Sequence, residues 1–171
     1  MTIVGISPSR PEARALIGEL DADISARYPG SPINGIEVDE FERAGGYFVI
    51  AKEGEAVLGC GAFRPAGAYS AEIKRMFVRP GARRRGVARS ILRHLEEEIR
   101  RRGFRSIVLE TGHSQHEAIF LYESEGYFPI PAFLGYVGSP ISRCFAKRPD
   151  QSSEPAPASG AAFPGRPPRR P

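Results

Sequence analysis

This chain has no apolar segment long enough to cross a membrane and too few cysteines for a disulfide framework. No run approaches the roughly 20 apolar residues that a bilayer-spanning helix needs. The first residues, Met1–Ile6, lack the basic and long apolar regions of a secretory signal. The 2 cysteines, Cys60 and Cys144, lie in strand-like apolar contexts, which predicts buried free thiols. Together these features predict a cytoplasmic protein without a membrane partner.

Residues that bind metals are also sparse. Of the 3 histidines, His113 and His116 lie close together, but no cysteine or acidic cluster completes a zinc set around them. These two side chains are candidates for shaping a pocket or relaying a proton, and ordinary surface histidines are the alternative. The sequence therefore predicts a function that needs no metal.

The composition separates a globular part from a proline-rich end. The 171 residues, 41% hydrophobic and 26% charged, are typical of one soluble domain with a substantial core. The final 23 residues contain 7 prolines and a single large apolar residue, Phe163, so they bury too little surface to offset the entropy of ordering. We predict a domain over residues 1–148 and a disordered tail over 149–171, with a proline-rich docking segment as the alternative for the tail.

The net charge of +4 hides a strong asymmetry. Residues 1–55 carry 10 acidic and 5 basic side chains, whereas residues 79–105 carry 10 arginines and 3 glutamates. This concentration of arginine predicts an anionic ligand near residues 79–105, and a solvated helix face is the alternative for part of it. A nucleic-acid-binding helix is a further alternative, although aromatic residues do not interleave with the arginines.

Hydrophobic periodicity predicts an α/β protein with a mixed sheet. Ser9 is the expected N-cap of the first helix. The strand–helix–strand order around residues 87–102 requires parallel pairing of the two flanking strands, whereas the three preceding strands form an antiparallel meander. The predicted strands are 2–6, 47–52, 56–63, 71–78, 106–110, one starting at 127, and 142–147, and the predicted helices are 10–28, 38–43, 87–102 and 118–125.

A basic turn with small residues precedes the helix at 87–102, with the pattern Arg83-x-x-Gly86-x-Ala88. Free backbone N–H groups point outward at a helix start, and the helix dipole adds partial positive charge there. The missing side chain at Gly86 lets a ligand approach closely. The turn therefore predicts a seat for a pyrophosphate or a similar anion.

Two motifs resemble those of the GNAT (Gcn5-related N-acetyltransferase) superfamily. Residues 71–80 with Arg83–Ala88 look like its motif A, usually Arg/Gln-x-x-Gly-x-Gly/Ala, and Ala118–Tyr127 look like motif B, commonly Ala-x-x-Leu-Tyr-x-x-x-Gly-Phe/Tyr. The likeness covers about residues 1–148. It implies the GNAT fold, an α/β arrangement with a mixed, mostly antiparallel sheet of about six or seven strands and about four helices.

The resemblance also implies an acyltransferase that moves the acetyl group of acetyl-CoA to a primary amine by direct attack in a ternary complex. A non-catalytic CoA-binding protein is the alternative. The cofactor-binding residues that it implies are Met76, Phe77 and Val78 for the pantetheine arm, and Arg83, Arg84, Arg85, Gly86, Val87, Ala88 and Ser90 for the pyrophosphate and its surroundings.

Two residues are expected to perform the chemistry. Tyr122 stands where the family places a tyrosine near the CoA sulfur, and a phenol with a pKa of about 10 stays available as a proton donor to the thiolate. Glu72 is the expected general base, because many family members carry a base on this strand. Glu110, at the end of the next parallel strand, is the competing carboxylate.

The acceptor is harder to read from the sequence. Tyr28, Tyr136 and the acidic segment 37–42 are expected at the acceptor wall, where negative charge would suit a cationic amine. Prolines in residues 129–140 favour a small closed pocket, and hence a small molecule. A protein lysine or N-terminal amine is the alternative, and exposed edge strands leave a homodimer open.

Overall fold

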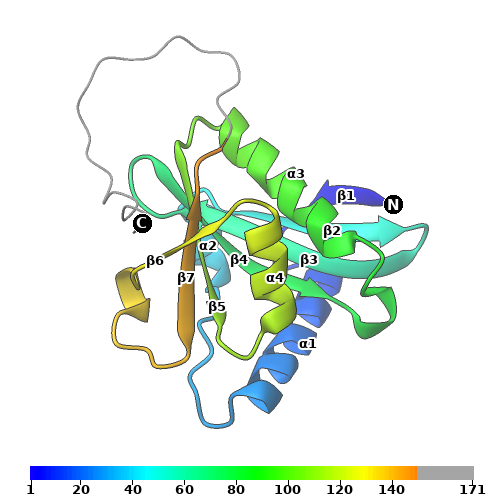
Figure 1. Ribbon diagram of the computed structural model, residues 1–171. Helices are drawn as coiled ribbons and strands as arrows, with labels where there is room; N and C mark the ends of the chain where they lie inside the picture. Colours follow the sequence, from blue (N-terminus) through cyan, green and yellow to red (C-terminus); the bar gives the residue numbers. More distant parts are fainter. Residues whose placement is uncertain (150–171) are drawn as a thin grey trace.

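A central sheet of 7 strands, flanked by helices, forms the core of the computed structural model, which describes residues 1–149 (Figure 1). The predicted tail lies outside the described residues, except for Pro149. The strands are β1 (Thr2–Gly5), β2 (Tyr47–Glu53), β3 (Ala56–Pro65), β4 (Ser70–Val78), β5 (Ser106–Gly112), β6 (Phe128–Ile130) and β7 (Ser142–Lys147). The helices are α1 (Pro11–Arg27), α2 (Val38–Arg43), α3 (Val87–Arg101) and α4 (His116–Ser124), with short 3-10 turns at Pro80–Ala82 and Leu134–Tyr136.

The strand order β1-β2-β3-β4-β5-β7-β6 confirms the predicted fold class. Neighbouring strands pair antiparallel except β4 and β5, which pair in parallel from Ser70 opposite Ser106 to Ile73 opposite Leu109. The parallel pair is the one that α3 connects, as the strand–helix–strand order requires.

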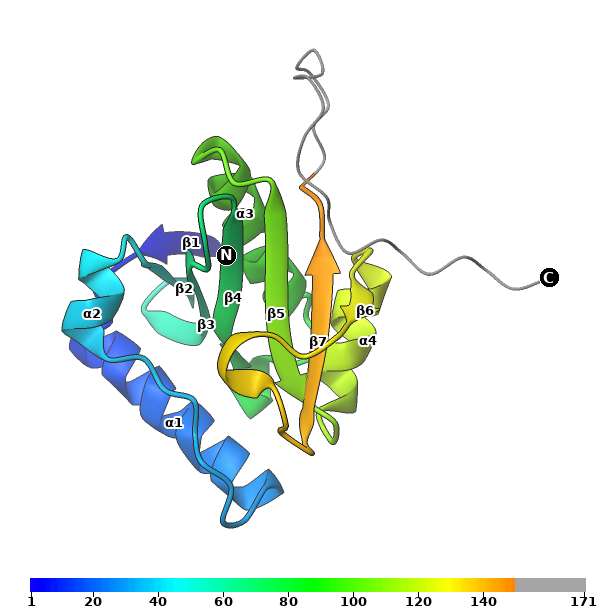
Figure 2. The same cartoon turned by 90° about the vertical axis from the view of Figure 1, so that its left-hand side faces the viewer.

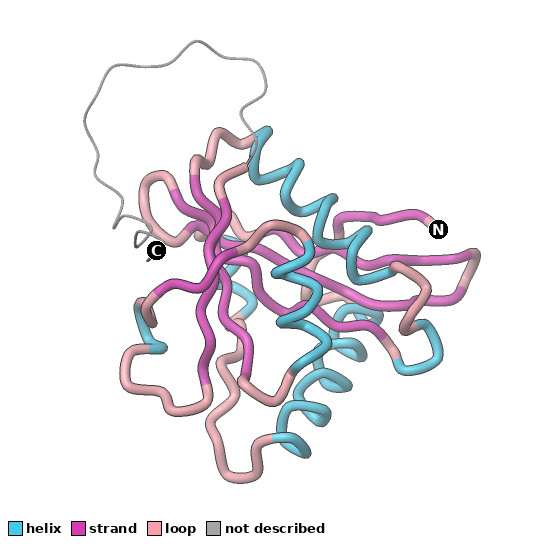
Figure 3. The backbone as a smooth tube through the Cα atoms, viewed as in Figure 1, coloured by secondary structure: helices cyan, strands magenta, loops and turns pink. Residues whose placement is uncertain are grey.

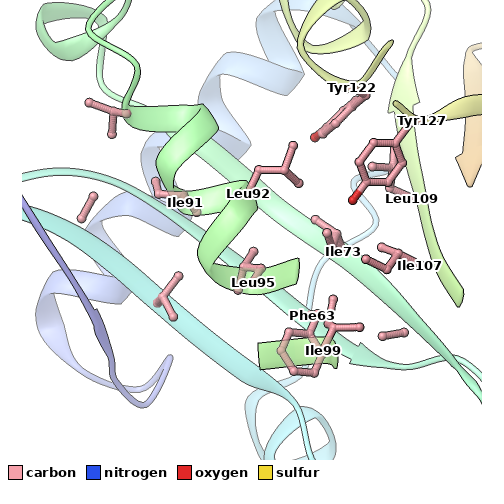
Figure 4. Packing of buried hydrophobic residues seen from close by; sticks show 14 of the residues in the cluster. Phe63, Ile73, Ile91, Leu92, Leu95, Ile99, Ile107, Leu109, Tyr122 and Tyr127 are labelled. Atoms are coloured by element: carbon pink, nitrogen blue, oxygen red, sulfur yellow. The ribbon is translucent and has the colours of Figure 1, made fainter. Parts of the chain in front are cut away.

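Helices cover both faces of the sheet: α3 and α4 lie on one side, α1 and α2 on the other (Figures 1, 2 and 3). On α3 the buried residues Ile91, Leu95 and Ile99 recur every four positions, so they form one apolar stripe. Figure 4 shows this stripe facing Phe63 and Ile73 of the sheet. This packing holds the start of α3 against the end of β4.

The N-terminal cap of α1 differs from the sequence prediction. Arg10, rather than Ser9, is the N-cap residue, and no side chain caps this end. Ser9 is engaged locally instead, because its backbone N–H and its hydroxyl both bond to the hydroxyl of Ser7. Pro11 at the first helical position has no N–H group, so one fewer donor needs a cap.

Both cysteines are free and buried, as predicted. Burial raises the pKa of Cys60 to about 12, so this thiol stays protonated and serves as an apolar core residue that also bonds to the carbonyl of Arg75 at 3.3 Å. Among residues 1–149 no helix combines the length and apolar character of a bilayer span.

We expect Leu95→Ala to lower the free energy of unfolding by about 2–5 kcal/mol, because Leu95 is fully buried between α3 and the sheet. Urea denaturation followed by circular dichroism measures this loss. Ala15, which is exposed on α1, provides the control: Ala15→Ser should change the unfolding free energy far less. Equal effects at the two positions would contradict the packing described here.

Candidate functional site

A β-bulge at Arg75 divides strand β4 into two halves. Arg75 has a φ of 58°, which is in the left-handed region. Lys74 pairs with Ala62 and Phe77 pairs with Cys60, so β4 has one residue more than β3 between these pairs. Backbone strain of this kind often marks functional sites.

The bulge changes which side chains face each helical layer. Before the bulge, Ile73 packs in the apolar cluster under α3. After it, Met76 and Val78 pack against that same cluster, whereas Phe77 packs in the cluster under α1. Strict alternation would have placed Met76 on the other face from Ile73.

The sheet opens just past this bulge. Pairing between β4 and β5 stops at Ile73 and Leu109, so residues 74–78 and 110–112 do not pair with each other. A cavity of about 650 Å³ lies at this opening. The two strands contribute residues 73–78 and 110–112 to its wall. The start of α3 contributes residues 82–84 and 86–89. The C-terminal half of α1, the loop after it and α4 complete the lining.

The start of α3 offers backbone donors to this cavity. Gly86 is its N-cap with a φ of 79°, and no side chain caps the helix. Within residues 1–149 the backbone N–H groups of residues 84–89 have no hydrogen-bond acceptor. The first backbone N–H group of this region that has one belongs to Ser90, which donates to the Gly86 carbonyl at 3.0 Å. Free donors at a helix start, surrounded by arginines, fit an anion such as a pyrophosphate.

Most of the residues expected to bind a cofactor line this one cavity. They are Met76, Phe77, Val78, Arg83, Arg84, Gly86, Val87 and Ala88. Arg85 and Ser90 do not line it. Arg85 is instead paired with Glu53 of β2 at 2.7 Å. The structure thus brings the strand and the turn together as one surface, with these two residues outside it.

Tyr122 of α4 lines the same cavity and is only 4% exposed. Its ring packs edge-on against Tyr127, with ring centroids 5.7 Å apart. Burial, and to a lesser extent the Glu110 carboxylate, raises the pKa of Tyr122, so its hydroxyl keeps its proton at neutral pH. Within the described residues this hydroxyl has no hydrogen-bond partner, which leaves it available to a bound molecule.

The two candidate carboxylates have opposite environments. Glu110 lies on the cavity wall, where burial raises its pKa and the neighbouring Ser142 and Lys74 offset part of that rise. Glu72 is fully buried and does not line the cavity. Of the two, Glu110 is the carboxylate that a ligand in the cavity can reach.

Glu72 is held by three partners. Its carboxylate accepts hydrogen bonds from Arg64 at 2.8 Å, Lys74 at 3.2 Å and the Tyr136 hydroxyl at 2.6 Å. Burial alone would raise the pKa of this carboxyl. The charges of Lys74 and Arg64 and the hydroxyl of Tyr136 outweigh burial and hold the pKa below its usual range. Glu72 thus orients Lys74 and Tyr136, which do line the cavity.

Two of the expected acceptor-wall residues, Tyr28 and Tyr136, line the cavity. The Tyr28 ring lies so close to Gly112 at the end of β5 that any side chain there would collide with it. The acidic segment 37–42 does not line the cavity. Its first residue, Glu37, instead caps α2 by accepting from the backbone N–H groups of Asp39 and Glu40.

His113, in the loop before α4, and His116, the first residue of α4, do not line the cavity either. His113 packs edge-on against the Tyr28 ring, with centroids 5.6 Å apart, and thereby supports that wall. Residues 1–149 contain no group of three or more His, Cys, Asp and Glu side chains placed to hold a metal ion.

An ionic chain, which was not predicted from the sequence, links three parts of the cavity wall. Arg27 of α1 pairs with Glu117 of α4 at 2.6 Å and with Asp23 at 2.8 Å, and Asp23 also pairs with Arg83 at 3.4 Å. Asp23 and Arg27 are an i, i+4 pair on α1, but Glu117 and Arg83 are far from them in sequence, and no local pattern signals those two pairings. The same holds for Arg75, whose place on the cavity wall depends on the bulge.

The arginines at the end of α3 are largely neutralised by their own helix. Arg100 pairs with Glu97, and both Arg101 and Arg102 pair with Glu98, at 2.5–2.7 Å. This arrangement favours a solvated helix face over a nucleic-acid-binding surface for this part of the chain.

Comparison with known proteins gives one consistent family. The model of the Acetyltransferase (GNAT) family matches residues 17–127. An IAA acetyltransferase of Azospirillum brasilense is 33% identical over 144 residues, which are 83% of this chain and 94% of that protein.

Solved structures agree with this match. A putative acyl-CoA N-acyltransferase from Klebsiella pneumoniae superposes with a TM-score of 0.73 at 29% identity, covering 87% of this chain and 97% of the other. YncA, a putative acetyltransferase from Salmonella typhimurium solved with its cofactor acetyl-CoA, shares the fold with a TM-score of 0.62 at 18% identity, covering 92% of this chain and 98% of the other.

Proposed function

The chain belongs to the GNAT family of acetyltransferases and is an acetyl-CoA-dependent enzyme, and we propose that it acetylates the primary amine of a small molecule. In this proposal Tyr122 is the general acid and Glu110 is the general base. The observation that carries it is the joint position of free helix-start N–H groups, Tyr122 and Glu110 on one cavity at the opening between β4 and β5.

Acetyl-CoA would lie with its pyrophosphate on the backbone N–H groups of residues 84–89. Met76, Phe77 and Val78 would follow its pantetheine arm, because the unpaired part of β4 offers backbone groups that β5 does not use. The thioester would then lie between the strands, where Tyr122 and Glu110 both line the cavity. Arg85 and Ser90 do not line the cavity, so in this proposal they make no direct contact with the pantetheine arm or the thioester.

The reaction takes two protons from the nitrogen and gives one to the sulfur. Glu110 would take the first proton from the substrate ammonium and later release it to solvent, and the free amine nitrogen would attack the thioester carbonyl carbon. As the C–S bond breaks, the Tyr122 hydroxyl would give its proton to the thiolate sulfur, and the second proton of the new C–N nitrogen would return Tyr122 to the phenol. Holding both substrates in one cavity supplies much of the rate enhancement.

Glu110 is chosen as the base over Glu72 because of its position on the cavity wall and its pKa. A base needs contact with its substrate and a pKa near the working pH. Glu110 lies on the cavity wall with a raised pKa, whereas Glu72 lies behind it with a lowered pKa and three bonded partners. The sequence-based assignment of Glu72 stays a prediction, and the geometry favours a positioning role for it.

A small acceptor is supported by the enclosure of the cavity. Tyr28 lies against the end of β5, and Tyr136, Ile141 and the loop residues Pro32 and Asn34 also line the cavity. The acceptor would therefore enter a walled pocket rather than lie on a flat surface. A protein lysine or N-terminal amine is the competing acceptor.

The experiment that tests this function is a CoA-release assay over a chemically diverse amine library, with mass spectrometry of the products. A set of small primary amines acetylated with saturable kinetics is the expected result. Efficient acetylation of peptide or protein amines only would contradict the small-molecule assignment. Binding of acetyl-CoA with no turnover on any amine would contradict the catalytic one.

We expect acetyl-CoA to stabilise the protein, and Ala88→Asp to weaken that effect. At a hundred times its Kd a ligand adds about 2.7 kcal/mol, which is roughly 5–10 °C in Tm for a domain of this size. Aspartate in the first turn of α3 favours the helix dipole, yet it would repel the pyrophosphate, so affinity should fall about ten-fold or more. Thermal shift against acetyl-CoA concentration measures both.

Ala15→Asp is the matched control, because it adds the same charge on the exposed face of α1, away from the cavity. It should leave the acetyl-CoA titration unchanged. An Ala88→Asp protein that binds acetyl-CoA as tightly as this control would place the pyrophosphate elsewhere.

A further inference from the structure

Arg75 is a buried cation on the cavity wall with one edge of its guanidinium unused. Its side chain is 4% exposed, and Nη1 donates to Oδ1 of Asp21 on α1 at 2.5 Å. Nε is fully buried and has no hydrogen-bond partner. Within residues 1–149 no acceptor bonds to Nη2 either. A buried donor without an acceptor is costly, so such groups are rare in native proteins.

The unused edge has the shape of a carboxylate site. Nε and Nη2 carry two parallel N–H bonds, which match the two oxygens of a carboxylate. Arg79, four residues on, shows the filled form: its Nε and Nη2 hold Glu19 of α1 at 3.0 and 2.7 Å. Arg93 likewise binds Glu125 through the same two atoms, at 2.8 and 3.2 Å. Arg75 is far more buried than either, yet these two atoms have no acceptor within the described residues.

Arg75 belongs to the part of the cavity assigned above to the acceptor. Its guanidinium lies between Asp21 and the loop after α1, where a Cβ atom added at Gly35 would come within 3.0 Å of Nη2. Pro32 and Asn34 of that loop line the same cavity. The free N–H groups at the start of α3, which are assigned to the pyrophosphate, belong to another element of the same cavity lining.

The neighbouring residue Lys74 adds positive charge. Its ammonium donates to Glu72 at 3.2 Å and to the Tyr136 hydroxyl at 2.7 Å, which leaves its third donor without a partner among the described residues. Glu72 also pairs with Arg64, so one carboxylate is shared by two cations. The Arg64–Glu72–Lys74 cluster therefore carries one net positive charge, which the nearby Glu110 carboxylate balances while it is ionised. Once Glu110 has taken a proton from the ammonium, a negatively charged group on the acceptor would be favoured there.

We infer that the acceptor carries a carboxylate besides its amine, and that Arg75 binds this carboxylate through Nε and Nη2. Lys74 lies beside it as a second cation, and Glu110 receives the ammonium end. The acceptor class is then an amino acid or a similar amino carboxylic acid, rather than a simple alkylamine. This inference rests on the proposed acetylation of a small amine.

Matched acceptors test the inference directly. Each amino acid of a panel is compared with its amide and with the amine that lacks the carboxyl group, and kcat/KM is measured by CoA release. Carboxylate-bearing acceptors should be preferred by at least about ten-fold, the effect of one charge-assisted contact. Arg75→Lys keeps the charge without the paired N–H edge, and Arg75→Met removes both. Each should lower the preference ratio, Arg75→Met by about ten-fold.

Arg79→Met is the matched control, because Arg79 also links the β4 side to α1 through a carboxylate but does not line the cavity. It should keep the preference ratio of the original protein. Thermal stabilisation by acetyl-CoA shows whether each variant is folded and binds the donor.

Three outcomes would overturn the inference. Equal kcat/KM for acids, amides and decarboxylated amines would show that the enzyme does not recognise a carboxylate on the acceptor. The proposed acetyltransferase function would be unaffected by this result. An equal loss on all acceptors in the Arg75 variants would assign Arg75 a structural role only. Binding of acetyl-CoA without acetylation of any amine would contradict the proposed function and therefore also the inference.

Discussion

Tyr122→Phe should lower kcat about 100-fold, within the range for loss of a general acid, while the fold and acetyl-CoA binding persist. The phenol is the one proton donor of α4 on the cavity wall with its hydroxyl free among the described residues, and its raised pKa keeps it protonated. Because the ring remains, the packing against Tyr127 should survive. Steady-state kinetics with saturating acetyl-CoA measure the change.

Tyr127→Phe is the control for this experiment. Tyr127 is equally buried, but its hydroxyl bonds to Glu96 of α3 at 2.9 Å and does not line the cavity. This variant should lose stability, because a buried hydrogen bond is broken, and keep kcat close to its original value. If the two variants lost kcat alike, Tyr122 would be a packing residue and the acid would lie elsewhere.

Glu110→Gln should lower kcat/KM about 100- to 1,000-fold near neutral pH, because an amide cannot accept the ammonium proton. The base must be ionised to act, and burial raises the pKa of Glu110. Activity of the original enzyme should therefore fall as pH drops through a value above the usual range for glutamate. This acidic limb should be absent in the residual activity of the variant.

The same variant should not lose stability at neutral pH. A carboxyl whose pKa is raised by folding favours the protonated state in the native protein, so its ionisation costs stability as pH rises through the folded pKa. Glutamine does not ionise and avoids that cost. Urea denaturation at pH 5 and pH 8 should show a smaller loss of stability with rising pH in Glu110→Gln than in the original protein.

Glu72→Gln separates the two candidate bases. Glu72 is buried with Arg64 and Lys74 as charged partners, so removing its charge should lower the free energy of unfolding. The acidic limb of the pH profile should persist in this variant. If Glu72→Gln abolished that limb and Glu110→Gln retained it, Glu72 would be the base as the sequence predicted.

Local sequence signals were enough for the elements and their order. The stripe of Ile91, Leu95 and Ile99 predicted α3, and the strand–helix–strand rule predicted the parallel pairing of β4 and β5. The cap of α1 was wrong by one residue, because Ser9 competes for local hydrogen bonds that the pattern does not reveal. Cap positions depend on such local competition.

The site was predictable where it is made of contiguous residues. The turn from Arg83 to Ala88 and the position of Tyr122 follow from short motifs, and the structure brings both to one cavity. The contribution of Arg75 was not predictable, since nothing in the strand sequence signals a left-handed residue there. Burial and pairing of Glu72 also arise from Arg64 and Tyr136, which the chain brings together only on folding.

Because of the bulge at Arg75, the number of residues in β4 affects which side chains reach the cavity. Counting along the strand, odd-numbered positions face α3 before the bulge and even-numbered positions face it afterwards, as with Ile73 and Met76. Deleting Arg75 would restore strict alternation along β4 and leave Met76 and Phe77 on their present faces. A family member that lacks this extra residue would therefore present the same side chains to its donor but have no guanidinium at this place in its acceptor half, so gaps in alignments at this position carry information about acceptor specificity.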